Sequence, residues 1–156
     1  MFREMRRIRQ QTDTAECERI LEAAKRGVLS VNGDGGYPYG VPMDFVYADG
    51  KIYFHSALAG HKLDAIRADD KVSFCVLSDG VKEPDDWWYH FTSVIVFGRL
   101  RVVEDEGARI DAFRKLGMKY FPTAEMVEHD IKKDAARALI LELTIEHMTG
   151  KRVREN

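Results

Sequence analysis

The segment 54–66 carries the side chains whose types and spacing are best suited to hold an anion. Ser56 supplies a hydroxyl, His61 can become a cation, and Lys62 is a cation at neutral pH. The pattern predicts a strand that ends near Ser56 and a short helix that begins near His61. A helix N-terminus presents unpaired N–H groups and a partial positive charge. The segment therefore suits a phosphate monoester, although neither the P-loop nor the dinucleotide-binding glycine pattern is present.

The extended segment before it contains two prolines, Pro38 and Pro42. Proline donates no hydrogen bond to a sheet ladder, so we expect this strand at an edge or with a bulge. Backbone groups next to Pro42 are then left for another partner. A flavin ring needs such a surface, because it requires flat apolar contact together with N–H and C=O groups that face its pyrimidine edge.

Other chemistry is less well supported by these side chains. His55, His61, His90 and Cys75 lack the close spacing of zinc ligands, so we expect no metal site. Haem is a more serious alternative, since His61 or His90 could be an axial ligand, although no feature of the sequence selects either one. Ser56 has histidines nearby but no nucleophile elbow, which argues against a nucleophilic triad.

The composition excludes several classes of protein. With 24 Lys and Arg against 26 Asp and Glu, the net charge is −2, which disfavours general nucleic-acid binding. The sequence has neither an apolar run long enough for a membrane span nor a secretory signal, so we expect a cytoplasmic protein. Cys17 and Cys75 lie far apart, which argues against a disulfide scaffold. The length suits one domain over residues 1–156, with residues 1–12, rich in arginine, as a flexible basic arm.

The elements that must position these side chains follow from the hydrophobic period. A helix is expected from Asp13, with Gly27 closing it, and two more at 105–120 and 125–133. Six strands are expected at residues 28–32, 37–47, 51–55, 71–78, 93–103 and 138–147. Six strands with short connections favour a mainly β fold, an antiparallel barrel with peripheral helices.

The loop at residues 79–91 has a different composition, because it is polar, aromatic and rich in turn residues. It contains both tryptophans of the chain, Trp87 and Trp88. Long loops in compact domains are often functional, so this one could form an interface or a lid. Equally, its aromatic side chains could simply pack against the barrel.

Five short motifs, taken in order, resemble the pyridoxamine 5'-phosphate oxidase-like superfamily, and more closely its Nim-type branch of 5-nitroimidazole reductase-like flavoproteins. They are YPYGVPM (37–43), IYFHS (52–56), GHKL (60–63), SVIVFG (93–98) and IEHMTGK (145–151). The resemblance runs from about residue 17 to residue 151. It implies a split β-barrel that forms a homodimer and binds FMN at the subunit interface.

The resemblance also implies roles for individual residues. The strand at Pro42, Met43, Asp44 and Phe45 would contact the isoalloxazine ring. His55 and Ser56 would lie beside the ribityl-phosphate, and His61 and Lys62 would hold the phosphate. Ser93 of the partner subunit would help to close the site, and Thr149, Gly150 and Lys151 match a family block near the same interface. His61 is also the first choice for the histidine beside the flavin, with His55 in reserve.

Two functions of different classes follow. The first is an FMN-dependent reductase of small electrophiles such as nitroaromatics, with NAD(P)H or another reductant as electron donor and His61 as the titratable group that supplies a proton. The second is a flavin- or haem-binding protein without turnover, which serves storage or sensing. The C-terminal Arg-x-His segment of true pyridoxamine phosphate oxidases is lacking, so vitamin B6 oxidation is disfavoured.

Overall fold

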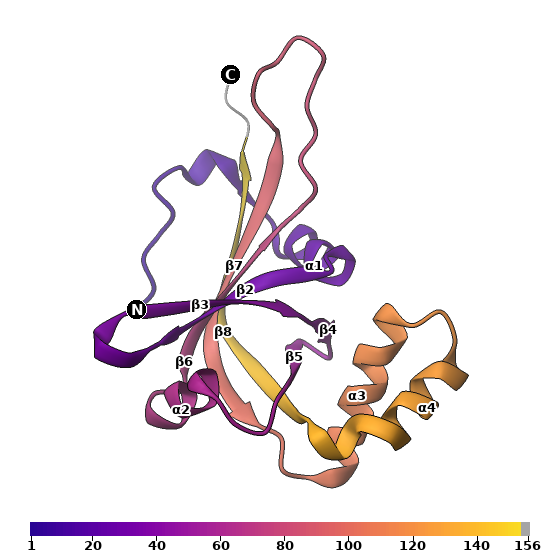
Figure 1. Cartoon of the computed structure of the whole chain (residues 1–156). Helices are drawn as coiled ribbons and strands as arrows, with labels where there is room; N and C mark the ends of the chain where they lie inside the picture. Colours follow the sequence, from indigo (N-terminus) through magenta and orange to yellow (C-terminus); the bar gives the residue numbers. More distant parts are fainter. Residues whose placement is uncertain (154–156) are drawn as a thin grey trace.

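The computed structural model describes residues 1–153, which form one antiparallel sheet, curled into a half-barrel, with helices at its periphery (Figure 1). The order of the strands is β3-β2-β6-β7-β8-β5-β4, and β1 pairs with the end of β8. The strands are β1 (Gln11–Thr12), β2 (Arg26–Asn32), β3 (Pro38–Asp44), β4 (Val46–Ala48), β5 (Lys51–Ser56), β6 (Lys71–Leu77), β7 (Phe91–Val102) and β8 (Leu139–Val153).

The mainly β split-barrel prediction is confirmed, but the predicted number of strands is too low, because the described part of the sheet has 8 strands. The expected strand at 37–47 is two strands, β3 and β4, separated at Phe45. There the chain leaves the ladder, because the hydroxyl of Tyr120 accepts a hydrogen bond from the Phe45 N–H. The other additional strand, β1, belongs to the N-terminal segment.

Within residues 1–153, four α-helices lie at the periphery of the sheet: α1 (Thr14–Ala23), α2 (His61–Ala68), α3 (Glu106–Tyr120) and α4 (Ala124–Asp134). Short 3-10 turns lie at Ile8–Gln10 (η1), Asp34–Gly36 (η2) and Ala135–Arg137 (η3). Asp13 caps α1 as expected, since its carboxylate accepts from the Glu16 N–H at 2.8 Å. No helix within residues 1–153 is long and apolar enough to cross a membrane.

The expected closing role of Gly27 is wrong, because α1 ends at Ala23 and Gly27 lies inside β2 opposite Met43. A Cβ atom at Gly27 would overlap the ring of Phe74 on the neighbouring strand β6. Close packing between strands, and not a helix end, therefore requires glycine at this position.

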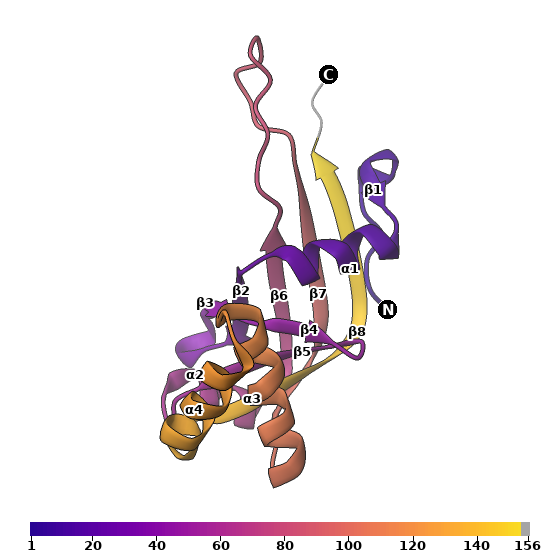
Figure 2. The same cartoon turned by 90° about the vertical axis from the view of Figure 1, so that its right-hand side faces the viewer.

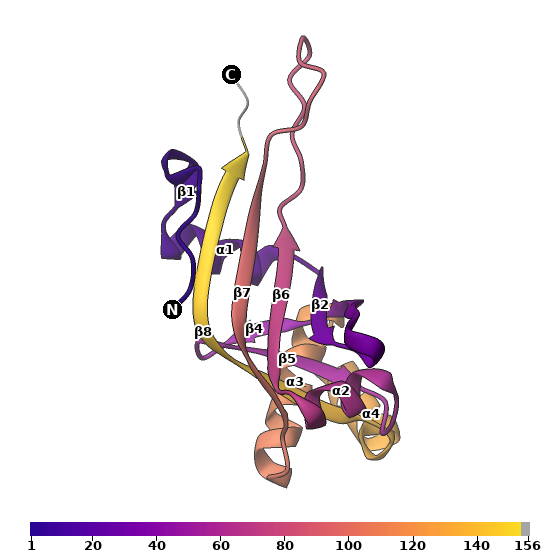
Figure 3. The same ribbon diagram turned by 90° about the vertical axis from the view of Figure 1, so that its left-hand side faces the viewer.

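The two faces of the sheet differ along β6 and β7. Phe74, Val94 and Val96 are fully buried on the inner face, where α1 crosses the strands (Figure 2). Their neighbours in sequence alternate to the outer face, where Ile95 and Phe97 are each 39% exposed. Within the described chain no helix covers this outer face of β6, β7 and β8 (Figure 3).

A β-bulge in β8 changes which of its residues face the core. Phe97 pairs with His147, whereas the next residue of β7, Gly98, pairs with Ile145, so Glu146 is left without a partner. Before the bulge, Leu141 and Leu143 are fully buried in the core. After it, the odd-numbered residues from His147 to Val153 share the outer face with Phe97.

Residues 1–12, expected as a flexible basic arm, lie along this sheet. Gln11 and Thr12 form β1 opposite Lys151 and Gly150 of β8. The ring of Phe2 stacks on His147, with centroids 4.7 Å apart and planes at 5°. The arm therefore reaches the outer face of the sheet.

Candidate functional site

The N-terminus of α2 is open to an anion. The helix begins after Gly60, which has a φ of +136° and provides no side-chain cap. A φ in this region is strained for other residues, so glycine is required to turn the chain into the helix. The backbone N–H groups of His61 and Lys62 make no hydrogen bond within residues 1–153, because the first bonds to the Gly60 carbonyl come from Leu63 and Asp64.

Ser56 provides an unsatisfied hydroxyl at the same end of the sheet. It is the last residue of β5, paired with Leu139 of β8, and only 5% of the residue is exposed. Its Oγ is buried and has no hydrogen-bond partner in the described chain. Buried hydroxyl groups are normally paired, and an ordered water, an ion or a ligand would satisfy this one.

Lys62, in the first turn of α2, is a half-buried cation. Burial lowers the pKa of its ammonium group, and no charged neighbour offsets this effect. Its side chain makes no hydrogen bond or ion pair with the residues that the structure describes. A partly desolvated charge without a partner is costly, and an anionic ligand would remove that cost.

His61 is held by the turn between β2 and β3. Its ring stacks on Tyr39, with centroids 4.3 Å apart and planes at 20°. Its Nε2 accepts a hydrogen bond from the Asp34 N–H at 3.2 Å and lies 3.6 Å from the carboxylate of the same residue. The contact with Tyr39 could not be predicted from the sequence, because the two residues belong to separate motifs.

The second predicted group of residues lies at the other end of the long strands. Ser93 pairs with Lys151 and Ile95 pairs with Thr149, so these side chains share the outer face. Gly150 is buried between them, and a Cβ atom there would overlap Cys17 and Thr12. Leu77, at the end of β6, pairs with Ser93, whereas α2 precedes the start of β6 at Lys71. At a rise of about 3.3 Å per residue, β6 separates the two groups by roughly 20 Å.

The remaining predicted contacts divide between the two faces of their strands. On β3, Pro42 is exposed, whereas Met43 and Phe45 point into the core and are 8% and 0% exposed. The Asp44 carboxylate is paired with Arg26 at 2.7 Å. His55 is exposed on the face of β5 opposite to Ser56. The structure therefore brings Ser56, His61 and Lys62 to one end of the sheet, but not the side chains of Met43 and Phe45.

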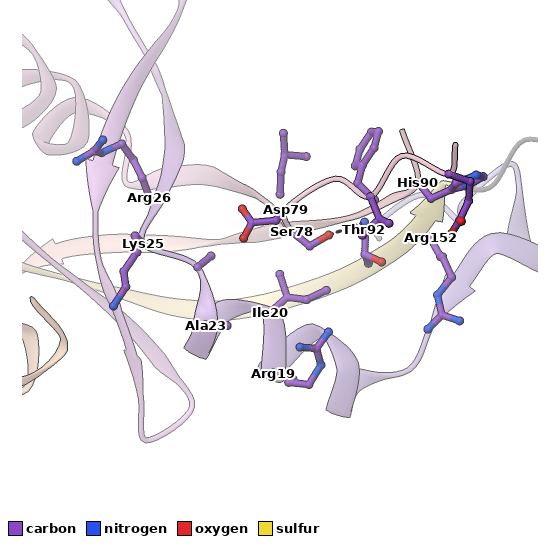
Figure 4. Close-up of a pocket in the computed structure, with 15 residues that line it drawn as sticks. Arg19, Ile20, Ala23, Lys25, Arg26, Ser78, Asp79, His90, Thr92 and Arg152 are labelled. Carbon is purple, nitrogen blue, oxygen red and sulfur yellow. Dashed lines mark hydrogen bonds between the residues drawn. The ribbon is translucent and has the colours of Figure 1, made fainter. Parts of the chain in front are cut away.

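A cavity of about 970 Å³, not anticipated from the sequence, lies between α1 and the loop that joins β6 to β7 (Figure 4). Its lining combines segments that are far apart in the chain, including Arg19 of α1, His90 of the loop and Arg152 of β8. Among residues 1–153 no group of three or more His, Cys, Asp and Glu side chains is arranged to hold a metal ion.

Solved structures share this fold. A protein assigned to 5-nitroimidazole antibiotic resistance from Bacteroides thetaiotaomicron is 20% identical, with a TM-score of 0.74 over 90% of this chain and 84% of that chain. The flavocytochrome of Azotobacter vinelandii is 20% identical, with a TM-score of 0.81 over 97% of this chain and 73% of that chain. The FAD-binding protein of Mycobacterium smegmatis is 22% identical, with a TM-score of 0.68 over 94% of this chain and 99% of that chain.

Sequence comparison gives the family. No curated protein sequence matches the chain. Residues 13–152, however, match the sequence model described as pyridoxamine 5'-phosphate oxidase. This match covers the five motifs that carry the resemblance and all the strands from β2 to β7. The chain therefore belongs to the pyridoxamine 5'-phosphate oxidase family.

Proposed function

We propose that the protein binds FMN and reduces small electrophiles such as nitroaromatics. The observation that carries the proposal is the buried Ser56 hydroxyl without a partner, close in sequence to the open N-terminus of α2. This set of donors fits the phosphate of FMN, since it combines a hydroxyl, free N–H groups and a cation. The fold is also shared with proteins named as a flavocytochrome and as FAD-binding, which supports a flavin.

In this proposal the phosphate is held by the Ser56 hydroxyl, the Lys62 ammonium group and the N–H groups of the first turn of α2. The unpaired charge of Lys62 gains a partner, so its pKa returns toward the ordinary value on binding. Pro42 lies on the outer face at the β3 edge, where it leaves backbone groups free for the flavin ring.

The position of the second group supports a homodimer. Ser93, Thr149 and Lys151 lie at the end of the sheet opposite to α2, on the outer face that no described helix covers. A second copy related by a two-fold axis would bring its own Ser93 to the α2 end of the first copy. The exposed apolar side chains of this face, Val28, Leu77, Ile95 and Phe97, would be buried by such an association.

We propose His61 as the residue that carries a proton. Because Nε2 accepts from the Asp34 N–H, the neutral ring carries its proton on Nδ1. Stacking on Tyr39 fixes the plane of the ring, so the direction of Nδ1 is set by the protein. Bound FMN would supply the two-electron redox chemistry. His55, exposed on the other face of β5, is the alternative proton carrier.

The visible spectrum of the purified protein tests the cofactor. We expect a flavin spectrum, and FMN after the chromophore is released by denaturation. A Soret band would instead favour the haem-binding alternative. A colourless protein that does not bind added FMN would contradict the proposal.

Anaerobic reduction tests the activity. The FMN-loaded protein is mixed with NADH, NADPH or a chemical reductant, and a nitroimidazole is added once the flavin is reduced. We expect reoxidation of the flavin together with reduction of the nitro group, to a nitroso group and water in the first two-electron step. A flavin that remains reduced would support binding without turnover, as in storage or sensing.

A further inference from the structure

The cavity beneath the β6–β7 loop lies on the opposite face of β7 and β8 from the proposed flavin residues. Thr92 and Arg152 are paired across these strands and line the cavity, whereas their neighbours Ser93 and Lys151 are paired on the outer face. The cavity is therefore a separate place in the molecule. The proposed function does not use it.

The cavity is surrounded by more positive than negative side chains. Among residues 1–153, four cationic residues line it, namely Arg19, Lys25, Arg26 and Arg152, against two carboxylates, Asp79 and Glu83. Arg19 is engaged by both carboxylate oxygens of Glu16 at 2.8 Å, and Arg26 is paired with Asp44. Arg152 makes no side-chain hydrogen bond or ion pair with any residue from 1 to 153. Its guanidinium donors are therefore unpaired at the cavity wall, although its charge lies close enough to Glu16 to help lower the pKa of that carboxyl group.

His90 contributes a second polar group that lacks a partner in the described chain. Its Nε2 lies 2.8 Å from a carboxylate oxygen of Asp86, which fixes the ring within the loop. Its Nδ1 is buried and has no hydrogen-bond partner in the described chain. With Nε2 engaged by Asp86, Nδ1 can accept from a hydroxyl, or donate to an anion when the ring is protonated. His90 and Arg152 both line the cavity (Figure 4).

We infer that this cavity is a second ligand site, which takes an organic phosphate of nucleotide size. Its volume of about 970 Å³ is at the upper end of the range for small-molecule sites and exceeds the needs of an inorganic ion. The phosphate binds between Arg152 and His90, since a guanidinium fork and a ring nitrogen together serve several phosphate oxygens. The apolar part of the ligand lies on α1 over the exposed Ala23, which is on the opposite wall.

The tryptophan pair gives a local test. Trp87 and Trp88 are the only tryptophans of the chain, and both lie in the β6–β7 loop, whose two ends line the cavity, so intrinsic fluorescence reports on this loop. The purified protein is titrated with adenosine 5'-monophosphate, and the heat of binding is measured in parallel. We expect a saturable change, with adenosine and inorganic phosphate each binding more weakly than the complete nucleotide.

Substitutions locate the binding. Arg152→Gln and His90→Gln are each expected to raise the Kd by about tenfold, since each removes a partner of a charged group. Arg137→Gln is the matched control, because this arginine is exposed and distant from the cavity lining. Lys62→Ala is expected to weaken FMN while leaving nucleotide binding unchanged, which separates the two sites.

Three outcomes would overturn the inference. They are the absence of saturable binding, a wild-type Kd in both Arg152→Gln and His90→Gln, and loss of nucleotide binding in Lys62→Ala alone. Tryptophan fluorescence that depends on protein concentration but not on the nucleotide would show instead that a second copy fills the cavity.

Discussion

Two half-buried lysines, Lys62 and Lys119, have pKa values that burial lowers, but their surroundings differ. Lys119, near the end of α3, lies 4.0 Å above the ring of Phe45 and donates to the carbonyl of Leu21 at 3.4 Å. Lys62, at the start of α2, has neither an ion pair nor a hydrogen bond in the described chain. Burial alone therefore does not distinguish a cation with partners inside the protein from one without them.

The neighbours of each lysine show the same contrast. Beside Lys119, the Tyr120 hydroxyl accepts from the Phe45 N–H at 2.9 Å and lies within donor distance of the carbonyls of Lys25, at 2.6 Å, and Phe45, at 2.9 Å. At the α2 end of the sheet, the Ser56 hydroxyl is buried without any partner. At the α3 end the polar groups are hydrogen-bonded to one another, whereas at the α2 end hydrogen-bond donors are left without partners in the described chain.

The largest effect is expected from Lys62→Ala. The variant should weaken FMN binding by about 1.5–3 kcal/mol, because the phosphate loses its charged partner. The Kd is measured by flavin fluorescence or calorimetry, with Lys71→Ala as a control for the loss of one exposed lysine nearby. Unchanged affinity would mean that the phosphate binds elsewhere.

Tyr120→Phe should cost about 1–2 kcal/mol in the free energy of unfolding, because the backbone groups of Phe45 lose their hydroxyl partner. Urea denaturation measures this cost. FMN affinity is expected to stay at the wild-type value. A variant as stable as the wild type would contradict the structural role of Tyr120. A variant that binds FMN more weakly would contradict the assignment of FMN binding to the α2 end alone.

Ser56→Ala should weaken FMN binding by about 1 kcal/mol but leave the stability of the ligand-free protein unchanged or raised, since no internal hydrogen bond is lost. Ser78→Ala is the matched control, because the Ser78 hydroxyl accepts from the Thr92 N–H at 2.9 Å. It should destabilise the protein. Equal losses of stability in the two variants would show that Ser56 has an internal partner after all.

Lys119→Met should have the smallest effect, confined to alkaline pH. Burial, with a contribution from Lys25, lowers the pKa of Lys119 to about 8, whereas an unfolded lysine has a pKa near 10.4. Between these values the unfolded chain binds more protons, so this lysine makes stability rise with pH. The partial exposure of Lys119 limits the gain to less than about 1 kcal/mol. Denaturation of both proteins at about pH 7.5 and 9.5 measures it, and parallel pH profiles would count against a buried Lys119.

The α2 end of the sheet was predictable because its residues are close in sequence. A strand end, a loop of small residues and a helix start placed Ser56 and Lys62 near each other without knowledge of the fold. The alternation of a strand also limits what can be assigned to it. Pro42 and Met43 face opposite sides of β3, so their side chains cannot both face one flavin ring.

The cavity beneath the loop could not have been predicted in the same way. It is enclosed only when Arg19, His90 and Arg152, from three distant parts of the chain, are brought together by the sheet. The predicted number of strands was wrong for a related reason. The division at Phe45 depends on Tyr120 of α3, a partner that no local pattern reveals.

The bulge at Glu146 shifts the alternation of β8 by one residue. This one unpaired residue reverses the side of the sheet on which the following residues of β8 lie, up to Val153, and it puts Thr149 and Lys151 on the outer face and Arg152 on the inner face. Deletion of Glu146 would restore simple alternation, so Thr149 and Lys151 would face inward and Arg152 would face outward. An insertion or deletion in β8 beyond the bulge would therefore change the outer surface and the inner cavity together.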